Sequence, residues 1–141
     1  MPTFFHFDHI QIPFKNRKRL KDFLNNLFER EGYRLERLDY IFCTDSSLLK
    51  INKEYLKHDT YTDIITFDIS DHPGKISGEI YISGERVLEN ARKYTVSFEE
   101  ELHRVIFHGA LHLCGYRDKT ATEKKQMREK ENENLRRYFK S

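Results

Sequence analysis

The sequence predicts an α+β fold in which a mixed β-sheet of about four strands packs with about five helices. Three observations support this class. Strand-like segments rich in apolar residues occur in the first part of the chain, and every segment from Ser83 onward has helical periodicity. No repeat, low-complexity tract or linker rich in Pro, Gly or Ser divides the 141 residues. We therefore expect one domain, residues 1–141, with helices covering a sheet.

The N-terminal half predicts two strands, each followed by a helix. Residues 3–12 alternate and are rich in Phe and Ile, which is typical of a strand. Asn16 suits the N-cap of a helix that Gly32 would close. Residues 33–43 predict a second strand, and residues 45–56 a short helix. The first helix has an apolar stripe made of Leu20, Phe23, Leu24, Leu27 and Phe28.

The middle of the chain predicts a hairpin of two strands. Residues 63–69 and 76–82 are rich in isoleucine and aromatic side chains, as strands are. Asp71, Pro73 and Gly74 lie between them and are typical of a turn.

Three helices are expected after this hairpin. The first covers roughly residues 84–94. Ser97 and Glu100 have the spacing of a capping box that begins the second helix, which runs to the region of Cys114. Thr120 and Glu123 form a similar box for the last helix.

Composition excludes few classes of function. The 25 basic and 23 acidic side chains nearly cancel, and a net charge of +2 neither indicates nor excludes binding of nucleic acid. No apolar run is long enough to cross a membrane, and the N-terminus lacks a signal-peptide pattern. Cys43 and Cys114 are too few for a disulfide framework. We expect a cytoplasmic protein with reduced thiols and no membrane contact, and the sequence leaves the oligomeric state open.

The most informative segment runs from residue 108 to residue 118. His108 and His112 are four residues apart, so on a helix both imidazoles point to the same side. Gly115 can end that helix in the left-handed conformation and let the chain bring Asp118 back as a third ligand. Two imidazoles, one carboxylate and an open position for water describe a catalytic zinc site. The same donors also suit iron, nickel or manganese. The sequence therefore predicts a metal site on a helix that borders a cleft.

Chance and two further enzyme classes account less well for residues 108–118. Histidine pairs at this spacing also arise by chance. The spacing matches the metzincin pattern H-E-x-x-H-x-x-G-x-x-H, but Gly109 stands where the protease has its glutamate base, which disfavours a metalloprotease. An iron oxygenase shares the donor set, yet three such ligands on one helix and turn would be unusual for it.

A second polar segment precedes the third predicted strand. Thr62 and Asp63 are candidate substrate-binding residues, although such a pair before a buried strand also serves as a turn or a cap. The basic run over residues 15–21 fits a solvated helix face better than a contact to RNA phosphates.

These segments together resemble the YbeY family of bacterial metal-dependent endoribonucleases. The family signature H-G-x-L-H-L-x-G-Y-D-H is matched by residues 108–118, and Glu123 and Met127 follow at the family's spacing. The family segment that reads L-N-x-x-Y-R…D-x-P-T-D-V-L-S-F is matched by residues 51–67. Residues 78–83 match a third element. The similarity runs in register from about Asp45 to Met127.

The resemblance implies a function that the residues alone do not. It implies an α+β fold, a zinc ion and cleavage of single-stranded RNA. It further implies a role in maturation of ribosomal RNA at the 3′ end of 16S rRNA, and so in ribosome biogenesis. Expected partners are a ribosomal RNA precursor and the small ribosomal subunit.

Two positions depart from the family pattern. Asp118 replaces a histidine, but a carboxylate is an acceptable zinc ligand. Leu56 replaces an arginine that would neutralise phosphate charge, and Arg117 is our candidate to contact phosphate in its place. Leu56 also keeps a non-catalytic ribosome-assembly factor with a structural metal as an alternative. No side chain in the signature is an obvious general base.

Overall fold

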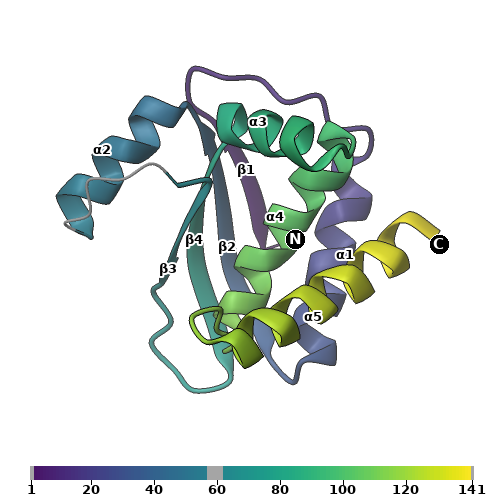
Figure 1. The fold of residues 1–141 in the computed structure, drawn as a ribbon. Coiled ribbons are helices and arrows are strands. Elements are labelled where there is room, and N and C mark those ends of the chain that lie inside the picture. Colours follow the sequence, from purple (N-terminus) through teal and green to yellow (C-terminus); the bar gives the residue numbers. More distant parts are fainter. Residues whose placement is uncertain (1, 57–61, 141) are drawn as a thin grey trace.

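The computed structural model describes residues 2–56 and 62–140, and four strands in these ranges form one sheet. The order of the strands is β1-β2-β4-β3, with β1, β2 and β4 parallel and β3 antiparallel to β4 (Figure 1). The predicted mixed sheet of about four strands is therefore confirmed. The strands are β1 (Thr3–Phe7), β2 (Arg34–Cys43), β3 (Ile64–Asp68) and β4 (Lys75–Ser83).

Five helices accompany the sheet in the described ranges, as predicted. They are α1 (Arg17–Arg30), α2 (Asp45–Tyr55), α3 (Gly84–Tyr94), α4 (Phe98–Leu113) and α5 (Ala121–Lys140). The predicted caps at Asn16 and Ser97 form, and each accepts a hydrogen bond from a backbone N–H three residues later. The capping box of α5 is reciprocal, because Thr120 and Glu123 each accept from the other's backbone N–H.

The first strand is shorter than the sequence predicts. We expected residues 3–12, but β1 ends at Phe7. It lies at the edge of the sheet and pairs only with β2, where Phe7 lies opposite Phe42 near the end of that strand. Beyond this point the partner strand ends, and His9 adopts a positive φ of 58°. The alternation of apolar residues nevertheless continues in the sequence beyond Phe7. It does so because Ile12, although it is not in a strand, is buried in the core. Residues 57–61, which belong to the segment 51–67 matched to the family pattern, lie outside the described residues.

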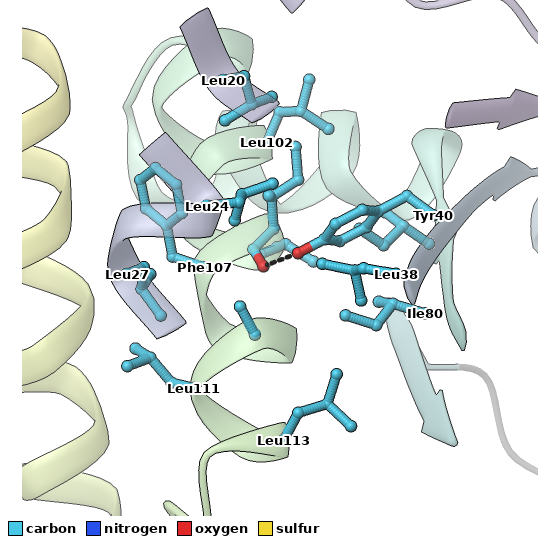
Figure 2. Packing of buried hydrophobic residues seen from close by; sticks show 14 of the residues in the cluster. Leu20, Leu24, Leu27, Leu38, Tyr40, Ile80, Leu102, Phe107, Leu111 and Leu113 are labelled. Atoms are coloured by element: carbon cyan, nitrogen blue, oxygen red, sulfur yellow. Dashed lines mark hydrogen bonds between the residues drawn. The ribbon is translucent and has the colours of Figure 1, made fainter. Parts of the chain in front are cut away.

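One face of the sheet carries the main core, and α4 packs directly on it. Along β4 every second side chain faces this core, including Ile80 and Ile82, which are fully buried. The hydroxyl of Tyr40 on β2 donates a hydrogen bond of 2.8 Å to the backbone carbonyl of Ile106 on α4 (Figure 2). Because this bond is buried, it fixes the helix that carries the histidine pair against the sheet.

The other face of the sheet is covered in part by α2. Its Leu48 packs with Cys43 of β2 and Ile65 of β3 in a second, smaller cluster. Cys43 and Cys114 are both free and buried, and burial raises the pKa of each thiol to about 12. A thiol with so high a pKa stays protonated and is a weak nucleophile, which fits the expected reduced state. In the described part of the chain, no helix is both long enough and apolar enough to cross a membrane.

Candidate active site

A cleft of about 640 Å³ lies between α4, β3 and the surrounding helices. Its volume is in the range of ligand-binding pockets. α2 contributes Asn52 to its lining, Leu56 lines it from the C-cap of α2, and α3 contributes Asn90 and Tyr94. The cleft brings together every residue that the sequence predicts as a metal ligand or substrate contact apart from Arg117. These residues are Thr62, Asp63, His108, His112 and Asp118.

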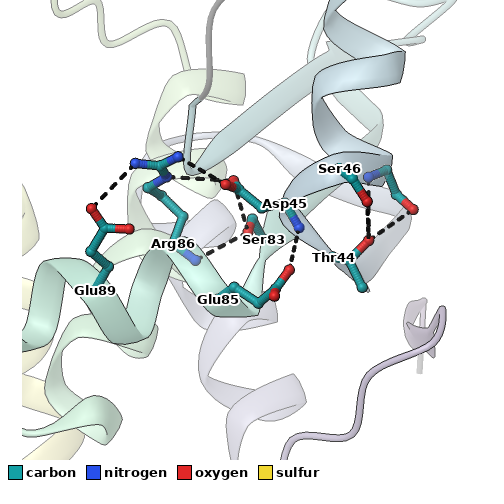
Figure 3. A network of polar contacts seen from close by, with 8 residues as sticks. Thr44, Asp45, Ser46, Ser83, Glu85, Arg86 and Glu89 are labelled. Atoms are coloured by element: carbon teal, nitrogen blue, oxygen red, sulfur yellow. Dashed lines mark hydrogen bonds and ion pairs between the residues drawn. The ribbon is translucent and has the colours of Figure 1, made fainter.

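A polar network ties the two outer walls of the cleft together. Asp45 opens α2, and its carboxylate accepts a hydrogen bond of 2.8 Å from Arg86 of α3 (Figure 3). The backbone N–H of Asp45 in turn donates to the carboxylate of Glu85 at 2.7 Å. Both helices begin where parallel strands β2 and β4 end, so the network holds α2 and α3 side by side at the carboxyl edge of the sheet.

The end of α4 has the conformation that the sequence predicts. Gly115 has a φ of 100°, and its N–H donates to the carbonyl of His112 at 3.0 Å. The N–H of Tyr116 donates to the carbonyl of Leu111 at 3.1 Å. These two bonds form a Schellman motif, which a glycine at this position permits. The chain therefore turns back on α4, and Asp118 Oδ2 lies 3.3 Å from His108 Nε2.

A residue that the sequence analysis missed completes the surroundings of His108. Glu131 of α5 accepts a hydrogen bond of 2.7 Å from His108 Nδ1. Its other oxygen accepts a bond of 3.1 Å from Arg104 of α4. The Glu131 side chain is only 8% exposed. In the sequence, Glu131 has helical spacing to Met127, Leu135 and Tyr138, and all four residues are buried in the structure. A carboxylate at a buried position of this kind needs a partner, which is the signal that could have identified it.

The charges around His108 act on its pKa in opposite directions. Burial disfavours the imidazolium, but the hydrogen bond to Glu131 and the charges of Glu131 and Asp118 outweigh burial and raise the pKa. Two further carboxyl groups line the cleft. Burial raises the pKa of both Asp63 and Glu101. Carboxyl groups of this kind in a cleft can carry protons in hydrolysis.

Gly109 faces away from the cleft and against the sheet. A Cβ atom at this position would lie 2.9 Å from Ile80 Cδ1 and 3.0 Å from Ile64 Cδ1. The helix and the sheet therefore approach as closely as they do because this residue has no side chain. A glutamate in place of Gly109 would not point toward His108 and His112, which argues against a protease-like base here.

A protein-family model described as Endoribonuclease YbeY matches residues 5–139, which is almost the whole chain. The chain belongs to this family.

Individual relatives agree with this assignment. Endoribonuclease YbeY of Cytophaga hutchinsonii is 47% identical over 132 residues, covering 94% of this chain and 92% of the relative. The protein of the same name from Flavobacterium psychrophilum is 56% identical over 99 residues, covering 70% of each. The solution structure of a Thermotoga maritima protein superposes with a TM-score of 0.63 at 27% identity, covering 96% of this chain and 89% of that one. The YbeY resemblance seen in the sequence is confirmed.

Leu56 and its proposed replacement as the phosphate contact, Arg117, occupy different surroundings. Leu56, in place of the arginine, lines the cleft and is 42% exposed. Arg117 is exposed but does not line the cleft, and it borders a separate depression with Tyr33 and Glu123. The structure therefore does not bring Arg117 to the place where a phosphate would meet His108 and Asp118.

The residues present fit a metal ion in part. Two donors bound to one tetrahedral zinc at about 2.0–2.2 Å are about 3.3 Å apart, which is the separation of His108 Nε2 and Asp118 Oδ2. The bond from His108 Nδ1 to Glu131 leaves Nε2 as the free donor, as in known carboxylate–histidine–zinc arrangements. Within the described residues, however, no three His, Cys, Asp or Glu side chains are arranged as a complete metal-binding group. His112 lines the same cleft but is exposed.

Proposed function

We propose that this YbeY family member is a metal-dependent endoribonuclease that cuts single-stranded RNA. Its substrate would be a ribosomal RNA precursor, with cleavage maturing the 3′ end of 16S rRNA, and it would act with the small ribosomal subunit during ribosome biogenesis in the cytoplasm. The observation that carries the proposal is the placement of His108 between Asp118 and buried Glu131 in a cleft. Relatives with 47% and 56% identity bear the name endoribonuclease.

His108, His112 and Asp118 would hold the metal, for which zinc is the first choice and nickel, iron or manganese are acceptable. Because His112 is exposed, its side chain can change rotamer without disturbing the core. A bound divalent ion would supply a Lewis acid for the scissile phosphate and lower the pKa of water. Glu131 would keep His108 in the tautomer whose Nε2 faces the ion.

Thr62 and Asp63 are proposed to contact the substrate, since both line the cleft just before β3. The Thr62 hydroxyl donates to the Ile64 carbonyl at 3.3 Å. This bond fixes the start of the strand, so the two side chains are held at the edge of the cleft opposite α4.

Leu56 favours a second candidate function. An apolar side chain lines the cleft where the family pattern has an arginine, so the cleft has one positive charge fewer for a phosphodiester. A ribosome-assembly factor with a structural metal would not need that charge. Such a protein would bind small-subunit particles without cutting their RNA.

One assay separates these two functions. The purified chain, with its zinc content measured, is incubated with a single-stranded ribosomal RNA precursor. We expect cleavage that EDTA stops and that the His112→Ala variant lacks. Cleavage that persists under either condition would contradict a metal-dependent nuclease. Binding to small-subunit particles without any cleavage would favour the assembly factor.

The Glu131→Gln substitution should weaken metal binding without removing it. The amide is neutral, so it holds the His108 imidazole less strongly and leaves Arg104 without its ion pair. Loss of an outer-shell partner of this type typically lowers metal affinity about 10–100-fold. Competition with a chromophoric zinc chelator would measure the change. Glu129→Gln is a matched control on the exposed face of α5, and equal zinc affinities in the two variants would contradict this role of Glu131.

A further inference from the structure

The cleft carries two arginines and no lysine among the described residues that line it. Arg104 comes from α4 and Arg128 from α5. Several carboxylates line the same cleft, so a phosphodiester entering it needs a positive group that is not already neutralised. These carboxylates are Asp63, Glu101, Asp118 and Glu131.

Arg104 is already engaged. Its side chain is only 16% exposed, and its guanidinium donates to Glu131 at 3.1 Å. The same carboxylate accepts from His108. Moving Arg104 onto a phosphate would leave a buried carboxylate with one partner fewer, so Arg104 is a positioning residue.

Arg128 differs from Arg104 in exposure and in contacts. Its side chain is 59% exposed, and its guanidinium lies 3.9 Å from Glu131, which is beyond hydrogen-bond distance. No hydrogen bond links Arg128 to another side chain in the described ranges, although its side chain lines the cleft and carries five N–H donors. Because Arg128 and Glu131 are three residues apart on α5, they lie on the same face of the helix, beside the proposed metal site.

We propose that Arg128 binds a backbone phosphate of the RNA in the cleft and so takes the place of the cation that is missing at Leu56. This inference rests on the proposed nuclease function. A guanidinium forms two parallel hydrogen bonds with a phosphate, which fixes its orientation as well as its charge. The weak attraction of Glu131 at 3.9 Å keeps the guanidinium near the cleft without saturating it.

The test measures binding of a fluorescent single-stranded oligouridylate to the zinc-loaded chain at several salt concentrations in a stopped-flow instrument, before cleavage proceeds. Arg128→Ala should raise the Kd about tenfold, as loss of a charge-assisted contact does. It should also reduce the slope of log K against log salt by about 0.7, the value for one contact to a single strand. Arg128→Lys should restore the slope but not the full affinity. Lys124→Ala, one turn earlier on α5 and outside the cleft, should leave both unchanged.

Each outcome decides the inference. If wild type cleaves RNA but Arg128→Ala keeps its Kd and its salt slope, the inference fails while the proposed function stands. If wild type neither binds nor cleaves single-stranded RNA, both fail. A loss of RNA binding that only follows a loss of zinc would assign Arg128 to the metal site and overturn the phosphate contact. Equal Kd values for Arg128→Lys and wild type would overturn the two-point geometry.

Discussion

Replacing Asp118 by alanine is expected to reduce zinc affinity by more than about 100-fold and to abolish RNA cleavage. A loss above about 100-fold would exceed the 10–100-fold typical of outer-shell partners, because a direct ligand is removed. Asp118 Oδ2 lies 3.3 Å from His108 Nε2, the separation of two donors on one zinc ion. Without it, two histidines from one helix remain, and two ligands do not hold zinc in a catalytic site.

Restoring the ligand with a different donor gives the sharper comparison. Asp118→His places an imidazole where the YbeY pattern has one and should bind zinc, since both donor types suit this metal. Asp71→Ala is the control, because Asp71 is an exposed acid on the hairpin turn that borders a different depression and does not line the cleft. Zinc should raise the Tm of wild type, Asp71→Ala and Asp118→His, but not that of Asp118→Ala. A zinc-dependent Tm shift in Asp118→Ala equal to that of wild type would contradict its role as a ligand.

The turn that brings Asp118 back to His108 was predictable because local rules decide it. Helical spacing places His108 and His112 on one face, and a glycine at the end of a helix reverses the chain at a known position. The structure confirms the turn at Gly115 and the return of Asp118 to His108. The completion of the site by His112 depends on its side-chain rotamer, which spacing does not fix, and it stays a prediction.

Contacts across elements were not predictable in the same way. The charged composition of α5 resembles a solvated face, yet Glu131 is buried against α4 and binds His108. Arg117 adjoins a proposed ligand in sequence, but the turn after Gly115 directs it to another depression. Arg128, farther along the chain, lines the cleft. The packing of α5 on α4 decides these positions, and no short sequence pattern encodes it.

The Gly109→Glu substitution, which restores the glutamate of the metzincin pattern, is expected to destabilise the fold by about 3 kcal/mol and to create no protease. The new Cβ would meet Ile80 and Ile64 at 2.9 and 3.0 Å, and overpacking of this kind typically costs about 1–3 kcal/mol. The carboxylate beyond it would be buried between α4 and the sheet, where burying a polar group without a partner costs a further ~1–3 kcal/mol. The better helix propensity of glutamate regains less than about 1 kcal/mol.

Urea denaturation of Gly109→Glu and of the control Gln126→Glu would measure this change in the free energy of unfolding. Gln126 is exposed on α5, so a glutamate there meets no close neighbour. Gly109→Ala should fall between wild type and Gly109→Glu, because the ends of the isoleucine side chains can shift to admit one methyl group. If Gly109→Glu were as stable as Gln126→Glu, the contact between α4 and the sheet would be looser than the structure shows. If it also cleaved a peptide, the position would face the cleft after all. The absence of a glutamate at position 109 therefore follows from how closely α4 lies on the sheet, and the same close approach places His108 at the cleft.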